Sequence, residues 1–494
     1  MELQFQKQES KCLRPLVREV KQTELTHELR LSDGMPDAGR ILGVWGQPVI
    51  RSKQWSGDQI TVSGGVMTWV LYAPEDGSEC RSMESWVPFQ IRWDIPDNGT
   101  DGGIRVAPSM RFADGRTISS RKMMIRMGLS LHMEALCPVT YTTFDPEELP
   151  DDVHILSENY PVQLAVASGE KIFTVDEELE SKDAAKLLRY TVHPEIVEKK
   201  MMGDKLIFRG NLNLHLLYGD PEGVIHSREE ELPFSQFEQM EEKIPENAAV
   251  NIDMIVTGLE LDLLDQRLHL KCSMAAQYLM EAVNMIRLVQ DAYGICRDVK
   301  LNEDTLSLPV ILEQRQDSMN GEATLSGKRG EVLDVTFNGD FPRQHLATLD
   351  AEQDFSGVFH VLYRSDDDSL QSADLRWENR RNFPVGENCI PDSKIVSQGK
   401  IKVAETGDGF QFSVPLRIET CTGTNQEWPM ITGLELGTIR EPDPARPSLI
   451  LCRPGTESLW SIAKRCGSTV SAIRQANRVE DEIPAKKILL IPVS

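Results

Sequence analysis

The stretch that decides the fold of this chain runs from Gln47 to Gly77 and reads QPVIRSKQWSGDQITVSGGVMTWVLYAPEDG. It returns without a gap from His193 to Gly223 as HPEIVEKKMMGDKLIFRGNLNLHLLYGDPEG. Apolar and polar residues alternate over much of Lys205–Tyr218, which is typical of a half-buried β-strand. Turn-forming Asp, Gly and Pro residues follow the Leu-Tyr pair of each copy, as a β-hairpin needs. The repeat therefore predicts tandem β-domains.

A third, weaker copy follows the first two. Glu331–Asp340 (EVLDVTFNGD) resembles the run into Gly57-Asp58, and Phe355–Tyr363 (FSGVFHVLY) resembles the strand that ends in Leu71-Tyr72. Each copy is long enough to bury a core of its own. We therefore expect a mainly β chain of three β-sandwich-like or barrel-like domains with few helices. The expected domains are 1–137, 138–300 and 301–440, followed by a linker at 441–447 and a small α+β (βααβ) module at 448–494.

Turn residues and apolar spacing predict the finer elements. One helix outside the terminal module is expected at Ala275–Tyr293, where the apolar spacing is mixed. Joints between domains are expected at Cys137–Glu158 and Asn302–Ser326, and the prolines of Arg440–Pro447 predict a semi-rigid spacer. A hairpin should close each domain. The expected hairpins are Met110–Glu134 turning at Asp114-Gly115, Gly258–Met274 turning at Leu264–Arg267, and Lys400–Glu419 turning at Gly407–Gly409.

Charge excludes one class of partner. The formal net charge is −24, which argues against nucleic acid, because phosphate binding needs clustered Lys and Arg. The segment Pro447–Ser494 holds seven Lys/Arg and four Asp/Glu, so it is net +3 and leaves −27 for the rest. A basic end on an acidic body indicates either an acidic partner or simply a soluble module.

Compartment signals point to the cytoplasm. The N-terminal run MELQFQKQESKCLRP lacks an apolar core of signal-peptide length, and no stretch approaches the ~20 apolar residues of a membrane span. The nine cysteines are scattered and show no CxxC spacing. Such cysteines are typical of reduced cytosolic thiols.

The last 46 residues carry a separate pattern. From Leu449 to Pro492 an apolar strand, a Pro-Gly turn, two short helical patterns and a second apolar strand follow one another. This resembles a LysM module, the small βααβ domain that usually grips N-acetylglucosamine polymers. In such modules two loops wall the sugar groove. The resemblance places the groove on Pro454, Gly455, Thr456, Glu457, Ser458 and Leu459, with Ile483, Pro484, Ala485 and Lys486 opposite and Asn477 bracing the loop.

Two departures put glycan binding in doubt while sparing the fold. In LysM modules the first loop is usually one residue shorter and has Asp after its Gly, whereas this chain has Thr456-Glu457. In the second loop, Lys486 occupies a position where Gly is common. A long side chain there would crowd the backbone approach to a sugar. Trp460 is expected in the module core rather than stacked on a sugar. The expected core is Leu459, Trp460, Ile462, Ala463, Val470, Ile473 and Ala476, closing over Ile488 and Leu490.

The body resembles a second family. Leu31–Leu42 reads LSDGMPDAGRIL, and with the tandem repeat and the terminal module it resembles the SPOCS family of SipL-type spore coat morphogenetic proteins. The second copy departs from the phrase at Ser181–Leu188 (SKDAAKLL). The resemblance implies a protein of the mother-cell cytoplasm, at the forespore surface. There it would bind the ATPase-type basement-layer protein of the spore coat, largely through its LysM module.

Catalytic and metal motifs are lacking in the sequence. There is no HExxH, GxSxG or GxxxxGK[ST] phrase. Asp366–Asp368 lacks the spacing of a calcium loop, and His215 and His269 are expected as satisfied strand residues. We therefore expect a non-enzymatic scaffold without metal, cofactor or nucleic acid. The alternative is a peptidoglycan-binding protein of the cell wall or spore cortex.

Overall fold

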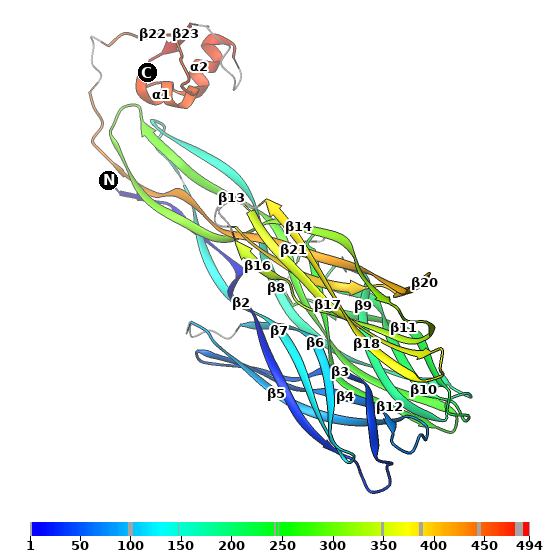
Figure 1. The fold of residues 1–494 in the computed structure, drawn as a ribbon. Helices are drawn as coiled ribbons and strands as arrows, with labels where there is room; N and C mark the ends of the chain where they lie inside the picture. The colour runs from blue at the N-terminus through cyan, green and yellow to red at the C-terminus, as the bar shows by residue number, and fades with distance from the viewer. Residues whose placement is uncertain are drawn as a thin grey trace.

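The computed structural model describes residues 2–96, 102–146, 148–241, 244–245, 247–346, 350–384, 389–441, 446–479 and 488–493. The prediction of a mainly β chain with an α+β terminal module is confirmed. The body is elongated, its long strands run roughly side by side, and the terminal module lies at one end (Figure 1).

One order of strands occurs three times along the body. A long strand leads into a sheet of antiparallel strands, and a hairpin then returns to pair with the long strand. The first unit consists of β2 (Gln6–Arg30), β3 (Ala38–Ser56), β4 (Gln59–Pro74), β5 (Arg81–Asp94), β6 (Gly103–Ser119) and β7 (Lys122–Asp145). The second consists of β8 (Val153–Glu180), β9 (Lys186–Met202), β10 (Lys205–Gly219), β11 (Ile225–Gln239), β12 (Ala249–Leu264) and β13 (Arg267–Gly294).

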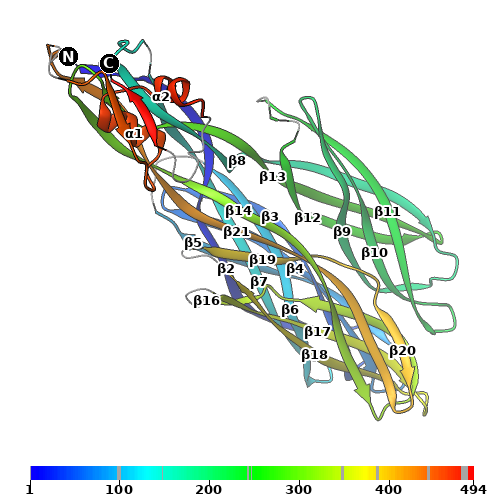
Figure 2. The same cartoon turned by 90° about the horizontal axis from the view of Figure 1, so that it is seen from above.

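The third unit repeats the order with more interruptions. It consists of β14 (Val299–Ser326), β15 (Gly330–Gly339), β16 (Arg343–Leu346), β17 (Asp350–Ser365), β18 (Leu370–Pro384), β19 (Ile390–Gln398), β20 (Lys402–Thr406) and β21 (Gly409–Leu436). The N-terminal strand β1 (Glu2–Gln4) pairs with β21, so the start of the chain is fastened to the third unit. Figure 2 shows β9, β10 and β11 side by side in the second unit.

The three long strand pairs each carry a β-bulge at an equivalent position. The pairs β2–β7, β8–β13 and β14–β21 each run antiparallel and each contain a register shift, between Pro15 and Val17, Met280 and Glu281, and Ile311 and Glu313. A bulge at the same place in each pair fixes which residues of the three units are equivalent. A single backbone pairing, Leu13 with Ala165, joins the first two units into one six-stranded sheet.

Equivalent positions of the units meet inside the body. Gly43, Arg189 and Asp334 each pair with the Leu that precedes Tyr at the end of the repeat's central strand. Arg189 and Asp334 form an ion pair at 2.7 Å with no exposed side-chain surface. A Cβ on Gly43 would lie 2.3 Å from the Trp45 ring. Three different residues at one repeated position thus let the units fit together.

Several finer predictions are wrong. Ala275–Tyr293 is not a helix but part of β13, which pairs along its length with β8. Its residues 275–283 are almost all buried, which explains an apolar pattern without strand alternation. The expected joint at Asn302–Ser326 lies within β14. Asp114-Gly115 lies within β6, and the chain turns at Ser120-Arg121 instead.

The other two closing hairpins turn where the sequence predicts. Asp265 and Gln266 have φ of 50° and 62° between β12 and β13, the left-handed pair that a two-residue hairpin requires. The third turn lies between β20 and β21, where Gly409 has φ of 152°.

Candidate functional site: the terminal module and its seat on the body

The terminal module comprises β22 (Leu449–Cys452), α1 (Leu459–Cys466), α2 (Val470–Asn477) and β23 (Leu489–Pro492). Both helices begin at a side-chain cap. Ser458 Oγ accepts from the Ser461 N–H at 3.2 Å, and Thr469 Oγ1 accepts from the Ala472 N–H at 2.9 Å. Gly467 ends α1 with φ of 63°, a conformation that favours glycine. These caps hold two eight-residue helices that would be marginal alone.

The module core differs from the expected one mainly at the last strand, where the buried positions are displaced by one residue. Leu489 and Ile491 have no exposed surface, whereas Ile488 and Leu490 are 52% and 38% exposed. Because side chains alternate along a strand, this one-residue difference moves the predicted pair to the outer face. Ala476 is also exposed. Leu459, Ile462, Ala463 and Ile473 are buried as expected.

The first groove loop is open to solvent. Gly455, Thr456, Glu457 and Ser458 are exposed, and Pro454 is half-buried. Glu457 accepts a hydrogen bond from Arg465 at 2.9 Å, so its carboxylate is already paired. The expected opposite wall, Ile483, Pro484, Ala485 and Lys486, lies outside the described residues.

Asn477 braces the last strand as expected. Its Oδ1 accepts from the Leu490 N–H at 2.7 Å, and its Nδ2 donates to the Leu490 carbonyl at 2.6 Å. Nδ2 also donates to the Ile473 carbonyl at 2.8 Å, which ties the end of α2 to β23. This side chain therefore fixes the two-stranded sheet against the helices.

The outer face of that sheet is apolar and exposed. Leu451 pairs with Leu490, and Leu449 with Pro492. The exposed fractions are 51% for Leu449 and 70% for Leu451. With Ile488 and Leu490 these residues form one surface, which we call the outer apolar face (Leu449, Leu451, Ile488 and Leu490). Sequence reasoning missed this surface because it assigned Ile488 and Leu490 to the core.

The other side of the module packs against the end of β13. We call this contact the seat; it joins Trp460, Lys464 and Ser468 of the module to Asp291 and Tyr293 of β13. Trp460 Nε1 donates to Asp291 Oδ2 at 2.8 Å, and Lys464 Nζ donates to Asp291 Oδ1 at 2.7 Å. The Trp460 ring meets Tyr293 edge to face, with centroids 4.8 Å apart. Tyr293 Oη donates to the Ser468 carbonyl at 2.8 Å. Trp460 therefore packs between the module and the body rather than in the module core alone.

Burial at this seat affects Tyr293. Desolvation, with a smaller contribution from Asp291, raises the pKa of Tyr293 to about 12, so its hydroxyl stays a hydrogen-bond donor at neutral pH. Because the sequence predicted a helix at Ala275–Tyr293, it did not indicate that Asp291 and Tyr293 would contact the terminal module. Their role depends on where β13 ends in space, which local sequence does not encode.

Comparisons with known families fit this geometry. A family model described as the SipL SPOCS domain matches residues 183–264, which hold β9, β10, β11 and β12 of the second unit. A LysM domain model matches residues 456–492. The chain carries a SPOCS domain and a C-terminal LysM domain. Both are binding or scaffold domains rather than catalytic ones. No curated protein and no solved structure matches the chain.

The described part of the chain shows neither a metal-binding cluster nor a membrane-spanning helix. No group of three or more His, Cys, Asp or Glu residues there is arranged to hold a metal ion. Among the same residues, no helix has the length and apolar character needed to cross a bilayer. His215, expected as a satisfied strand residue, lies 2.9 Å from both Asp334 and Ser227.

Proposed function

We propose that the chain is a non-enzymatic scaffold of endospore coat assembly. In this proposal it works in the mother-cell cytoplasm and docks the ATPase-type basement-layer protein of the coat at the forespore surface. The LysM domain makes the contact, and each of the three strand units is a SPOCS domain. The SPOCS match at 183–264 and the LysM match at 456–492 support an adaptor of this kind.

The outer apolar face of the LysM domain is the observation that carries the proposal. Exposed aliphatic side chains gathered on one small sheet mark a surface that gains free energy when a protein covers it. The seat on β13 holds the domain by the side of α1, through Trp460 and Lys464. Leu449, Leu451, Ile488 and Leu490 therefore stay available for a partner.

The alternative is a peptidoglycan-binding protein of the cell wall or spore cortex. The LysM match and the open loop at Gly455–Ser458 favour it. Glu457 weighs against it, because its carboxylate is engaged with Arg465 at 2.9 Å within the loop that would face the sugar. A sugar would have to compete with that ion pair for the loop.

A paired binding assay separates the two functions. The full chain, immobilised, is offered the purified coat basement-layer protein and, separately, purified peptidoglycan. The variants are Leu451→Asp on the outer apolar face and Thr456→Trp in the groove loop. Leu264→Asp is the matched control, because Leu264 is also an exposed leucine (58%) and lies at the end of β12, far from the outer apolar face. Docking predicts that only Leu451→Asp loses the protein partner.

The opposite pattern would overturn the proposal. If peptidoglycan is retained, Thr456→Trp abolishes that retention and no coat protein is captured, the chain is a glycan binder. A fluorescent fusion adds an independent readout of location. We expect a shell around the forespore during sporulation, and labelling of the envelope of vegetative cells would contradict it.

A further inference from the structure

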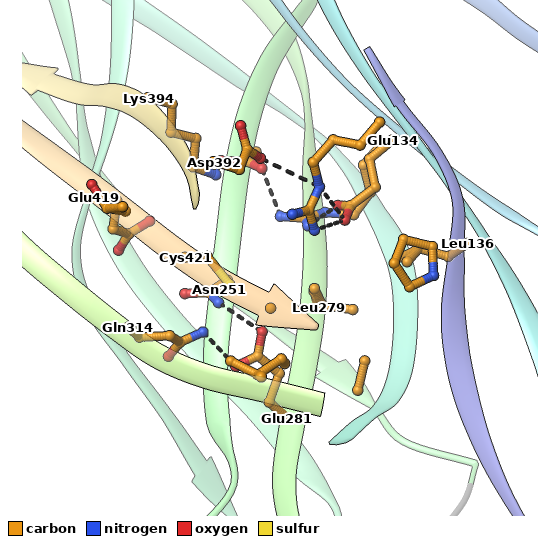
Figure 3. Close-up of a pocket in the computed structure, with 18 of the residues that line it drawn as sticks. Glu134, Leu136, Asn251, Leu279, Glu281, Gln314, Asp392, Lys394, Glu419 and Cys421 are labelled. Atoms are coloured by element: carbon orange, nitrogen blue, oxygen red, sulfur yellow. Dashed lines mark hydrogen bonds and ion pairs between the residues drawn. The ribbon is translucent and has the colours of Figure 1, made fainter. Parts of the chain in front are cut away.

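A large cavity lies where the three strand units meet. Its volume is about 1450 Å³, above the ~300–1,000 Å³ typical of small-molecule sites, and all three units line it. Figure 3 shows side chains from different strands, including Glu134, Glu281, Asp392 and Cys421, turned toward this space. No family match accounts for this cavity, and the LysM domain is not part of it.

Equivalent positions around the cavity carry unlike residues. At the bulges of the long strand pairs stand Leu136, Glu281 and Gly423. Two residues earlier stand Glu134, Leu279 and Cys421, which face Arg105, Asn251 and Asp392 on the neighbouring strands. An axis that served only to pack three units would be filled with close-packed apolar side chains. Here the centre is open and its lining is different in each unit.

The cavity has an apolar level and a polar level. Leu13, Leu136, Ala165 and Leu279 form a small apolar cluster near the bulges. The polar level lies further along the same strands and is lined by His132 and Glu419. Asp253 and Lys394 also line it, and they form an ion pair with each other. A ligand that filled this space would therefore have an apolar part and a polar end.

Of the six acidic residues that line the cavity, all but the exposed Glu19 already have donors. Glu134 is paired with Arg18 and with Arg105, the latter at 2.7 Å. Asp253 is paired with Arg105 at 2.6 Å and with Lys394. Three carboxamides, from Gln163, Asn251 and Gln314, donate to Glu281. The same holds for Asp392, which lies near Arg18 and His132, and for Glu419, which accepts from Gln316.

Several donors of the same cavity have no acceptor. Gln353 is 1% exposed, and neither atom of its amide has a hydrogen-bond partner. The buried Nε2 of Gln344 and Nε of Arg105 are likewise unpaired. Lys199 makes no hydrogen bond or ion pair with any described residue. Burial lowers its pKa, and the nearby carboxylates of Glu419 and Asp253 offset this only in part. Apart from Gln353 Oε1, the unpaired atoms named here are all N–H donors. Leaving buried donors unpaired is costly, so this site chiefly lacks an acceptor.

We propose that this cavity binds a small organic anion with an apolar body. Its oxyanion takes the unpaired donors, Lys199 foremost, and its apolar body lies against Leu13, Leu136, Ala165 and Leu279. The proposal does not depend on the LysM domain or on coat assembly. It gives the body of the protein a ligand-binding role beside any scaffold role.

Three probes with the same ten-carbon chain test the charge that the cavity selects. Decanoate, decanol and decyltrimethylammonium are titrated into the full chain by isothermal calorimetry. We expect saturable one-to-one binding of decanoate and at least tenfold weaker binding of the neutral and cationic probes, because only decanoate supplies a charged acceptor.

Variants locate the binding. Lys199→Gln should weaken decanoate at least tenfold, and Leu279→Trp should block it by filling the apolar level. Lys271→Gln, an exposed lysine on β13 outside the cavity, is the matched control and should bind like the parent. Thermal unfolding of each variant checks that it is folded.

Three results would overturn the proposal. The first is that decanoate does not bind below millimolar concentration. The second is that folded Lys199→Gln and Leu279→Trp bind decanoate as tightly as the parent chain does. The third is that the chain binds the cationic probe more tightly than decanoate. The last would make the cavity a cation site centred on its carboxylates. Each result leaves the LysM docking proposal untouched, because that test uses a different surface.

Discussion

Arg189 of the second unit and Asp334 of the third form a fully buried ion pair whose Nη1–Oδ2 distance is 2.7 Å. The guanidinium also lies over the Trp45 ring of the first unit, 5.0 Å from its centroid. Residues from all three units therefore meet at one point. His215 and Ser227 also contact the Asp334 carboxylate. The buried negative charge of Asp334 therefore has polar partners in place of water.

Breaking this pair should destabilise the whole body. Asp334→Ala leaves Arg189 buried and unpaired, which we expect to cost about 3–5 kcal/mol of unfolding free energy. Chemical denaturation measures the loss. The control is Glu178→Ala, which removes an exposed pair with Arg267 at 2.9 Å and should change stability by less than about 1 kcal/mol. Equal effects of the two variants would contradict a central role for the buried pair.

Acid should unfold the body through its buried carboxylates. Burial opposes ionisation of Asp392, but His132 and Arg18 outweigh it and lower its pKa to about 2. Arg189 likewise lowers the pKa of Asp334, and Arg18 and Arg105 lower that of Glu134, each against the effect of burial.

A carboxyl with a lowered folded-state pKa binds fewer protons in the folded than in the unfolded chain. Its contribution is therefore complete above about pH 4 and is lost as the pH falls toward the folded-state pKa; for Asp392 it is about 2 kcal/mol. Unfolding free energy measured from pH 7 down to pH 3 checks this. Asp392→Asn should flatten the fall, and a stability that does not change with pH would contradict the prediction.

Glu281 should act in the opposite direction. Burial raises the pKa of Glu281, because its hydrogen bonds come from carboxamides and the charges of Arg105 and Arg18 offset the burial only in part. The folded chain then holds this proton more tightly than the unfolded chain does, so stability falls as the pH rises above about 4.3, the ordinary value. In Glu281→Gln this loss between about pH 4 and 7 should vanish. Asp265→Asn, an exposed turn residue, should leave the pH profile unchanged.

Asp291 should hold the LysM domain on the body. Asp291→Ala removes the acceptor of both Trp460 and Lys464, and we expect the seat to lose about 1–3 kcal/mol. Hydrogen exchange should then quicken in β13 near Tyr293 and in α1, while the core strands β4 and β10 keep their protection. Asp265→Asn, in the turn that precedes β13 at its other end, is the control, because Asn tolerates the left-handed backbone there. Unchanged exchange in Asp291→Ala would show that the domain is held by other contacts.

Gly43 should tolerate no side chain. A Cβ there would lie 2.3 Å from the Trp45 ring and 2.7 Å from His360 Nε2. Gly43→Ala is expected to cost about 1–3 kcal/mol by overpacking. Gly34→Ala, where nothing lies within 4 Å of the added carbon, is the matched control for thermal unfolding. A variant at Gly43 as stable as the control would mean that the three units can shift apart at this point.

The amino-acid sequence by itself determined the class of fold and the terminal module. Period-two alternation and turn residues are local signals, and a repeat with its own turns predicts strands wherever it recurs. The caps at Ser458 and Thr469 are likewise local, because each bonds a backbone group three residues away. These features need no partner from elsewhere in the chain.

Only the tertiary structure decided which faces are buried and what meets at the centre. Residues 275–293 became a strand because β8 pairs with them, and the core side of β23 followed from its register with β22. The pairing of Arg189 with Asp334, the seat of Trp460 on Asp291 and the cavity all join residues more than 100 positions apart. Such contacts depend on how whole units pack, and no local pattern encodes that geometry.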